Sequence, residues 1–231
     1  GTFTLPTLPG TYYTWTVSGG GHIFNMKDRN TPTVNITFYD AAVYTVKCAY
    51  NNPLSGCSGN SIFTVTVKPV FEFVFGEETV CEGDTKIYNS NGNATWAVSP
   101  SGPVITPSGS SASVNWVTPG TYFLTATPTV PSNWCNSSAV KIVEVVPLPV
   151  LNPIAGIDSV CPGKNYIYSI SSDNDDNSFV WTITGGSGNI VSEMGANSDS
   201  VIVKWNGAGP WQLSVYQENE IAPGVVCQSL T

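Results

Sequence analysis

The chain has 231 residues, of which 10% are charged, and its 16 acidic and 8 basic residues give a formal net charge of −8 at pH 7. So few Lys and Arg residues exclude the basic patches that bind nucleic-acid phosphates or anionic lipid. No stretch reaches the ~20 apolar residues that span a bilayer. We therefore expect neither nucleic-acid binding nor membrane insertion.

Short runs that alternate apolar and polar residues predict an all-β protein. In chain order, the clearest runs are 13–17, 62–67, 200–205 and 211–216. Clusters of Gly, Pro, Asn and Ser separate them, as in short half-buried strands joined by turns. The pattern is typical of β-sandwiches.

An internal repeat divides the chain into three modules. Each copy has a Trp two residues before a Val or Ile, then two aromatic residues six positions apart, then a cysteine. The members are Trp15, Phe38, Tyr44 and Cys57; Trp96, Trp116, Tyr122 and Cys135; and Trp181, Trp205, Trp211 and Cys227. Equal spacings of this kind indicate tandem modules, and we place them at 1–69, 70–148 and 149–231.

The copies differ in completeness. The second and third open with matching Val-Cys-x-Gly segments, at 80–83 and 160–163, which the first lacks. We expect the first module to lack its first strand and the third to lack its last. The chain then samples a longer tandem array, and by itself exposes an unpaired sheet edge that favours aggregation.

The module junctions have distinct compositions. Segment 146–153 is rich in proline and predicts a short, stiff spacer. In segment 68–75, alternation places Phe71, Phe73 and Phe75 on one face. We favour a first strand that packs these rings into its core or the junction, over an exposed aromatic binding strip.

The six cysteines predict an oxidising, extracellular location and structural disulfides. The repeat pairs Cys81 with Cys135 and Cys161 with Cys227. The remaining two, Cys48 and Cys57, would then face each other across a hairpin. A zinc site is the alternative, but Cys-x-x-Cys pairs are absent and the chain has a single histidine.

No motif predicts catalysis. The single histidine, His22, lies beside a glycine run, where a solvated turn is the simpler interpretation than a catalytic triad. No phosphate-binding or dinucleotide-binding glycine motif is present. A carboxylate pair could in principle cleave glycosidic bonds, but modules this small leave little room for a deep cleft. We expect a non-enzyme.

One loop carries candidate metal ligands. Its carboxylates and amide are the hard oxygen ligands that Ca²⁺ takes, although the loop lacks the EF-hand glycine and terminal Glu. The candidates are Asp173, Asp175, Asp176 and Asn177. The alternative is a solvated loop in which Asp and Asn serve turn geometry. We expect no other cofactor.

Trp134, beside Cys135 in a hairpin loop, is a candidate ligand contact. The interpretation that we favour is that its ring folds back over the predicted disulfide.

The pattern Cys-x-Gly, Trp-x-Val-x-Gly-Gly, Val-x-Trp-x-x-x-Gly and Cys resembles the PKD-like and Ig-like tandem repeats of large Bacteroidetes surface proteins, including gliding-motility adhesins. The chain departs from true PKD domains, because Thr-Val, Ala-Val or Thr-Ile follows the Trp where they have Asp-Phe-Gly-Asp-Gly. The resemblance implies an elongated array of Ig-like sandwiches, type IX secretion and display at the cell surface. It also implies O-glycosylation at Asp-Ser motifs, here at Ser159 and Ser200.

We therefore expect a segment of a repetitive extracellular adhesin that acts as a disulfide-stapled stalk or adhesive fibre. Its partners would be neighbouring repeats of the same chain and an unknown surface polysaccharide or protein. The alternative is a glycan-binding accessory region of a secreted polysaccharide-degrading enzyme.

Overall fold

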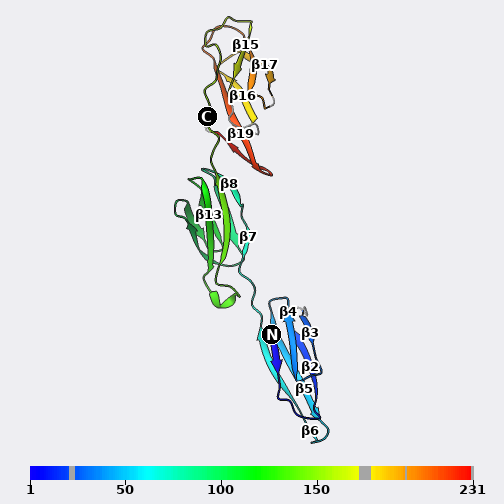
Figure 1. The fold of residues 1–231 in the computed structure, drawn as a ribbon. Coiled ribbons are helices and arrows are strands. Elements are labelled where there is room, and N and C mark those ends of the chain that lie inside the picture. The colour runs from blue at the N-terminus through cyan, green and yellow to red at the C-terminus, as the bar shows by residue number, and fades with distance from the viewer. Residues whose placement is uncertain (21–23, 172–177, 196, 230–231) are drawn as a thin grey trace. The chain divides into compact units, whose positions relative to one another are not determined.

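A computed structural model describes residues 1–20, 24–171, 178–195 and 197–229 (Figure 1). Within these ranges the regular structure is β-sheet, apart from one short 3-10 helix, η1 (Pro131–Asn133). The chain forms two compact units. One comprises residues 1–71 and 128–138, and the other comprises 72–127 and 139–231. The all-β prediction is confirmed.

The first unit contains one β-sandwich, called here the first sandwich. Its two sheets have the orders β1-β4-β3 and β2-β5-β6. The strands are β1 (Thr2–Thr4), β2 (Tyr12–Gly19), β3 (Phe24–Lys27), β4 (Thr33–Phe38), β5 (Val43–Asn52) and β6 (Cys57–Thr66). Alternation turns Val34 and Ile36 of β4 inward against Trp15, Val46 and Cys48 of the other sheet.

The second sandwich has two four-stranded sheets, β11-β12-β9-β7 and β10-β13-β14-β8. The strands are β7 (Phe73–Phe75), β8 (Thr79–Cys81), β9 (Thr85–Ser90), β10 (Ala94–Ser99), β11 (Val104–Ser108), β12 (Ser111–Asn115), β13 (Gly120–Pro128) and β14 (Ala139–Val146). Its core joins Tyr88 and Val114 of one sheet to Tyr122, Leu124 and Val143 of the other.

The third sandwich repeats the strand orders of the first, as β15-β18-β17 and β16-β19-β20. The strands are β15 (Asn165–Ser169), β16 (Ser178–Thr184), β17 (Gly188–Met194), β18 (Ser200–Trp205), β19 (Gln212–Ala222) and β20 (Val225–Gln228). We expected this module to lack its last strand. In the structure β20 forms the start of that strand and pairs with the end of β19.

The repeated aromatic residues have equivalent contacts in all three sandwiches. The six-residue pairs are in ring contact, with centroids 4.5 Å apart for Phe38 and Tyr44, 5.5 Å for Trp116 and Tyr122, and 6.4 Å for Trp205 and Trp211. The indole N–H of the first Trp of each copy donates to a backbone carbonyl in a turn. The three bonds are Trp15 to Thr31, Trp96 to Gly109 and Trp181 to Ser198.

The three phenylalanines of segment 68–75 do not share one face. Phe71 is 1% exposed and Phe75 is 58% exposed, while Phe73 is half-buried against Trp96. A register shift in β7 between Phe73 and Phe75 explains the difference. A bulge reverses the alternation of a strand and re-aims the following side chain. The predicted packing therefore holds for Phe71 and Phe73 but is wrong for Phe75.

One disulfide is present among the described residues, and it joins Cys81 of β8 to Cys227 of β20. The predicted pairing of Cys81 with Cys135 is therefore wrong. Cys81 is paired with Val146 at the end of β14, whereas Cys135 precedes the start of that strand. Eight residues of β14 span about 23 Å, and a disulfide needs Cα atoms within ~7 Å of each other.

The predicted pairing of Cys161 with Cys227 fails for the same reason. Cys161 lies near the end of β18, because the N–H of Gly163 donates to the carbonyl of Trp205 at 2.7 Å. Cys227 instead pairs with Asn219, far along β19. The two cysteines therefore lie at opposite ends of one sandwich, roughly 20 Å apart.

The predicted disulfide between Cys48 and Cys57 is also wrong. Across the antiparallel pair β5 and β6, Cys48 lies opposite Ser61 and Cys57 lies opposite Asn52. The offset of four residues corresponds to about 13 Å. Cys48 is buried in the core, whereas Cys57 is exposed, and both are free thiols.

Candidate functional site

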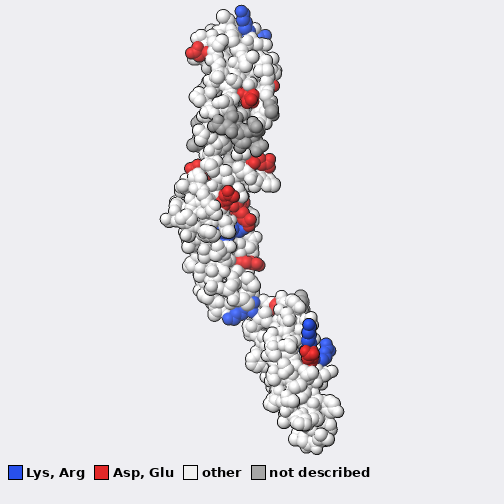
Figure 2. All heavy atoms as spheres, in the orientation of Figure 1, with Lys and Arg blue, Asp and Glu red and all other residues white. Residues whose placement is uncertain are grey.

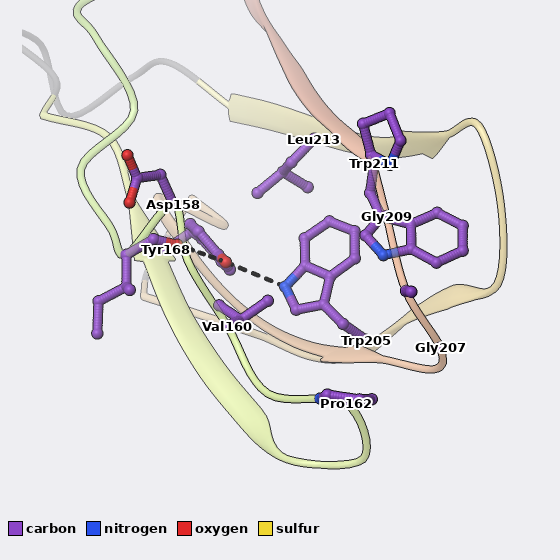
Figure 3. A pocket seen from close by; sticks show the side chains of 12 residues that line it. Asp158, Val160, Pro162, Tyr168, Trp205, Gly207, Gly209, Trp211 and Leu213 are labelled. Carbon is purple, nitrogen blue, oxygen red and sulfur yellow. Dashed lines mark hydrogen bonds between the residues drawn. The ribbon is translucent and has the colours of Figure 1, made fainter.

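The third sandwich contains a pocket of about 560 Å³ at the end where β18 leads into β19. Figure 3 shows its walls, which come from the segment before β15, from β15 and β18, from the loop that follows β18 and from the start of β19. Its lining is mainly aromatic and apolar. The lining includes Asp158, Val160, Tyr168, Trp205, Trp211 and Leu213.

Three rings form the rigid part of this pocket. Trp205 is 4% exposed, and its indole N–H donates to the hydroxyl of Tyr168 at 3.0 Å. The Tyr168 hydroxyl in turn donates to the backbone carbonyl of Ile157 at 2.9 Å. Trp211 is half-buried and stacks on Trp205 with an interplanar angle of 20°. The hydrogen bonds hold the two buried rings in place, as the dashed line in Figure 3 shows.

Glycines make room for these rings. A Cβ at Gly186 would lie 1.2 Å from the Trp211 ring, and one at Gly156 would lie 2.3 Å from the Tyr168 ring. Gly207, with φ of 110°, and Gly209 belong to the loop that leads to Trp211. Any side chain at Gly186 would displace the ring that forms one wall of the pocket.

The pocket combines aromatic walls with one exposed carboxylate, Asp158. Aromatic rings stack on the C–H faces of sugars and on other flat apolar groups, and a carboxylate accepts hydrogen bonds from hydroxyl donors. Among the described residues that line the pocket, Asp158 is the one carboxylate, and none is a histidine or a cysteine. The arrangement suits the binding of a neutral ligand.

The second sandwich carries the equivalent aromatic cluster. Gly76 lies against Tyr88 as Gly156 lies against Tyr168, with a Cβ–ring distance of 2.2 Å. The rings of Tyr88 and Trp116 meet edge-to-face at 5.8 Å, yet neither Tyr88 Oη nor Trp116 Nε1 has a hydrogen-bond partner among the described residues. Burial raises the pKa of the Tyr88 hydroxyl. The spacing of the repeated aromatics did not predict the pocket beside Trp211.

Trp134 has a contact that neither sequence interpretation predicted. Its ring meets the buried Phe71 edge-to-face, with centroids 5.2 Å apart and an interplanar angle of 73°. The adjacent Cys135 is a free thiol, so no disulfide lies beneath the ring. The Cys135 thiol donates to the carbonyl of Lys68 at 2.8 Å. A ring that is half-buried in this way has only part of its surface available to a ligand.

The remaining predicted sites stay predictions. The calcium candidates Asp173, Asp175, Asp176 and Asn177 and the lone His22 lie outside the described residues. Of the two glycosylation candidates, Ser159 is exposed in a loop, whereas Ser200 opens β18 and donates to Asp199 at 2.9 Å. No group of three metal-binding side chains occurs within the described ranges.

Charges are sparse on the face that Figure 2 shows. The ion pairs found in the described ranges involve two lysines of the second sandwich. Lys86 contacts Glu77 at 3.0 Å and Asp84 at 3.4 Å, and Lys141 contacts Glu78 at 3.0 Å. The described segments contain no helix with the length and apolar character needed to cross a bilayer.

The third sandwich matches a known family. Residues 147–226 match the model of the family described as PKD-like domain. No curated protein matches the chain.

The chain is also similar to several solved structures. The Bacteroides ovatus mixed-linkage glucan utilization locus protein SGBP-B, in complex with a mixed-linkage heptasaccharide, is 14% identical with a TM-score of 0.24, over 100% of this chain and 60% of that one. Invasin, a bacterial integrin-binding protein, is 11% identical with a TM-score of 0.27, over 99% of this chain and 55% of that one. Murine CEACAM1b is 14% identical with a TM-score of 0.30, over 70% and 96%. Scores this low carry no argument about function.

Proposed function

We propose that the chain is a non-catalytic, extracellular segment of a repetitive surface adhesin, in which the modules act as a stalk or adhesive fibre. The observation that carries the proposal is the disulfide between the second and third sandwiches, Cys81 to Cys227. A bond between two modules, rather than within one, restrains their relative motion. Such a restraint suits a spacer that holds a binding surface away from its anchor.

Other features support an extracellular spacer. Disulfides persist in oxidising compartments. Each sandwich has its own hydrophobic core, so the modules can be repeated without a shared core. Export by the type IX route, a role in gliding motility and an elongated array are finer parts of the same proposal, inferred from the resemblance of the repeat.

Small-angle X-ray scattering tests the spacer. We expect a maximum dimension near that of three sandwiches end to end, unchanged by salt. Reduction of Cys81–Cys227, or the Cys81→Ser/Cys227→Ser variant, should broaden the distance distribution because the second and third sandwiches are released. A compact particle, or a variant with an identical distribution, would contradict the proposal.

A second candidate function is glycan binding, as in an accessory region of a secreted polysaccharide-degrading enzyme. The pocket beside Trp211 favours it, because its stacked indoles and the Asp158 carboxylate provide both kinds of contact that sugars use. A glycan array followed by titration calorimetry tests it. Binding should be lost in Trp211→Ala and weakened in Asp158→Asn, while Trp134→Ala serves as the control at the other candidate ring.

A further inference from the structure

Two segments of the chain present a cysteine in the same backbone setting. They are the Val-Cys-x-Gly segments 80–83 and 160–163, called here the cysteine knuckles. Gly83 donates its N–H to the carbonyl of Trp116 at 2.7 Å, and Gly163 donates its N–H to that of Trp205 at 2.7 Å. Both glycines have positive φ, of 85° and 81°. Cys81 and Cys161 are therefore held in equivalent places on the second and third sandwiches.

Two other cysteines occupy equivalent places in a hairpin. Cys227 lies opposite Asn219 across β19 and β20, and Cys57 lies opposite Asn52 across β5 and β6. Each asparagine is the eighth residue after the second aromatic of its repeat, Trp211 or Tyr44. We call Cys57 and Cys227 the hairpin cysteines.

One knuckle and one hairpin cysteine are joined, and one of each is left over. The bond runs from the knuckle Cys81 of the second sandwich to the hairpin Cys227 of the next. Both of these residues are buried, whereas Cys161 and Cys57 are exposed free thiols. The same backbone frame thus holds a buried, bonded cysteine in one place and an exposed, free one in another.

The knuckle and the hairpin lie at opposite ends of a sandwich. In the third sandwich, Cys161 lies beside the end of β18, and Cys227 lies opposite Asn219, far along β19. A link from knuckle to hairpin therefore joins one module to another in a fixed direction and cannot close within a module. Repetition of this link would produce a head-to-tail order, a heterologous contact that extends rather than closes.

We propose that Cys161 and Cys57 form the same type of cross-link with other modules of the same kind. The knuckle cysteine Cys161 bonds to a hairpin cysteine, and the hairpin cysteine Cys57 bonds to a knuckle cysteine. A second copy of this chain supplies both partners, through Cys161 of one copy and Cys57 of the other. The inference rests on the proposed function as a run of modules, but it concerns which cysteines join them.

The chemistry is ordinary thiol–disulfide exchange with a disulfide oxidant such as oxidised glutathione. The Cys161 thiolate attacks a glutathione sulfur and displaces one glutathione thiolate, and the Cys57 thiolate then attacks the mixed disulfide and displaces the second. Two protein thiols are oxidised to one disulfide, and oxidised glutathione is reduced to two molecules of glutathione. The two protons leave with the glutathione.

The other two free cysteines are poorer partners. Cys48 is buried in the first core, and burial raises the pKa of its thiol, which lowers the thiolate fraction that attacks. Cys135 is exposed, but it lies in the irregular loop around η1 and donates to the Lys68 carbonyl at 2.8 Å. It therefore lacks the hairpin position that Cys57 and Cys227 share.

Two complementary variants test the proposal. The knuckle variant, Cys57→Ser/Cys135→Ser, keeps Cys161, and the hairpin variant, Cys135→Ser/Cys161→Ser, keeps Cys57. Mixed in a glutathione redox buffer, they should form a disulfide-linked heterodimer about tenfold faster than either variant alone forms a dimer, since their two thiols stand in the backbone settings that hold Cys81 and Cys227 together. Non-reducing peptide mapping should find Cys57 joined to Cys161, with Cys81–Cys227 intact.

A third variant, Cys57→Ser/Cys161→Ser, keeps Cys135 and is the matched control. It should form heterodimers with the knuckle variant no faster than the knuckle variant dimerises by itself. Equal rates for all mixtures would mean unselective oxidation of exposed thiols and would overturn the proposal, as would the absence of any heterodimer. Either result would leave the scattering test of the spacer unaffected.

Discussion

At the residue scale, equivalent tyrosines of two sandwiches differ in their hydrogen bonds. The hydroxyl of Tyr168 accepts from Trp205 and donates to Ile157, whereas that of Tyr88 has no partner among the described residues. A buried hydroxyl without a partner contributes little to stability, but removing one that is bonded leaves its partners unsatisfied. The same substitution should therefore have different effects at the two positions.

We predict that Tyr168→Phe lowers the free energy of unfolding by about 1–3 kcal/mol, because the Trp205 indole N–H is left without an acceptor. Tyr88→Phe should be neutral or slightly stabilising. Chemical denaturation monitored by tryptophan fluorescence measures both, with each variant as the control of the other. A larger loss in Tyr88→Phe would contradict the hydrogen-bond assignment.

The raised pKa of the Tyr44 hydroxyl predicts that the free energy of unfolding decreases at alkaline pH. Burial, and then the hydrogen bond to the Asp40 carboxylate and its charge, raise the pKa of this hydroxyl to about 12. In the unfolded chain the Tyr44 hydroxyl ionises near pH 10, so the folded state holds this proton more tightly. The stabilisation is fully present below pH 10 and is lost as the pH rises from 10 through 12. Denaturation at several pH values should show this decline, reduced in Tyr44→Phe.

At the element scale, the bulge in β7 gives Phe71 and Phe75 different burial, although simple alternation places both on the same face. Phe71 is buried against Trp134, whereas Phe75 is exposed beyond the register shift. Burial of a Phe side chain removes large apolar area from water, and truncation leaves a cavity. The bulge, rather than the residue type, decides which of the two stabilises the fold.

We predict that Phe71→Ala lowers the free energy of unfolding by about 3–5 kcal/mol, whereas Phe75→Ala changes it by less than about 0.5 kcal/mol. Differential scanning calorimetry distinguishes them, since the transition affected should be the one that contains Phe71. Equal losses in the two variants would mean that the alternation continues through β7.

At the scale of the whole molecule, the disulfide closes a loop with a sequence separation of 146 residues. In the chain-entropy model, a loop of this length restrains the unfolded chain by about 5 kcal/mol. The disulfide restrains the whole loop only when the second and third sandwiches are both unfolded, so most of this stabilisation appears only if they unfold together. The disulfide therefore bears on cooperativity as well as on stability.

We predict that Cys81→Ser/Cys227→Ser separates the unfolding of the second and third sandwiches into two transitions, and that the oxidised wild-type chain unfolds them closer together. Calorimetry in the absence of reductant compares the two proteins, and the wild type with reductant added is the control. One unchanged transition in the variant would show that the bond does not couple the sandwiches.

The sequence by itself determined the all-β class and the recurring aromatic positions of the three modules. Alternation and spacing are local properties, and the first Trp of the repeat is buried at Trp15 and Trp181 but only half-buried at Trp96. The partial burial of Trp134 and the outward turn of Phe75 could not be read from the same pattern, because they depend on a loop contact and on a bulge.

Only the tertiary structure decided which cysteines bond and where a pocket forms. The repeat suggested disulfides within modules because equivalent cysteines recur in each, yet strand direction places Cys81 and Cys135 at opposite ends of β14. The order of cysteines in the sequence does not show at which end of a sandwich each one lies, whereas a disulfide requires the two Cα atoms to lie within ~7 Å of each other. Likewise, the pocket exists because Gly186 and the loop after β18 hold Trp211 against Trp205, an arrangement that spacing alone does not predict.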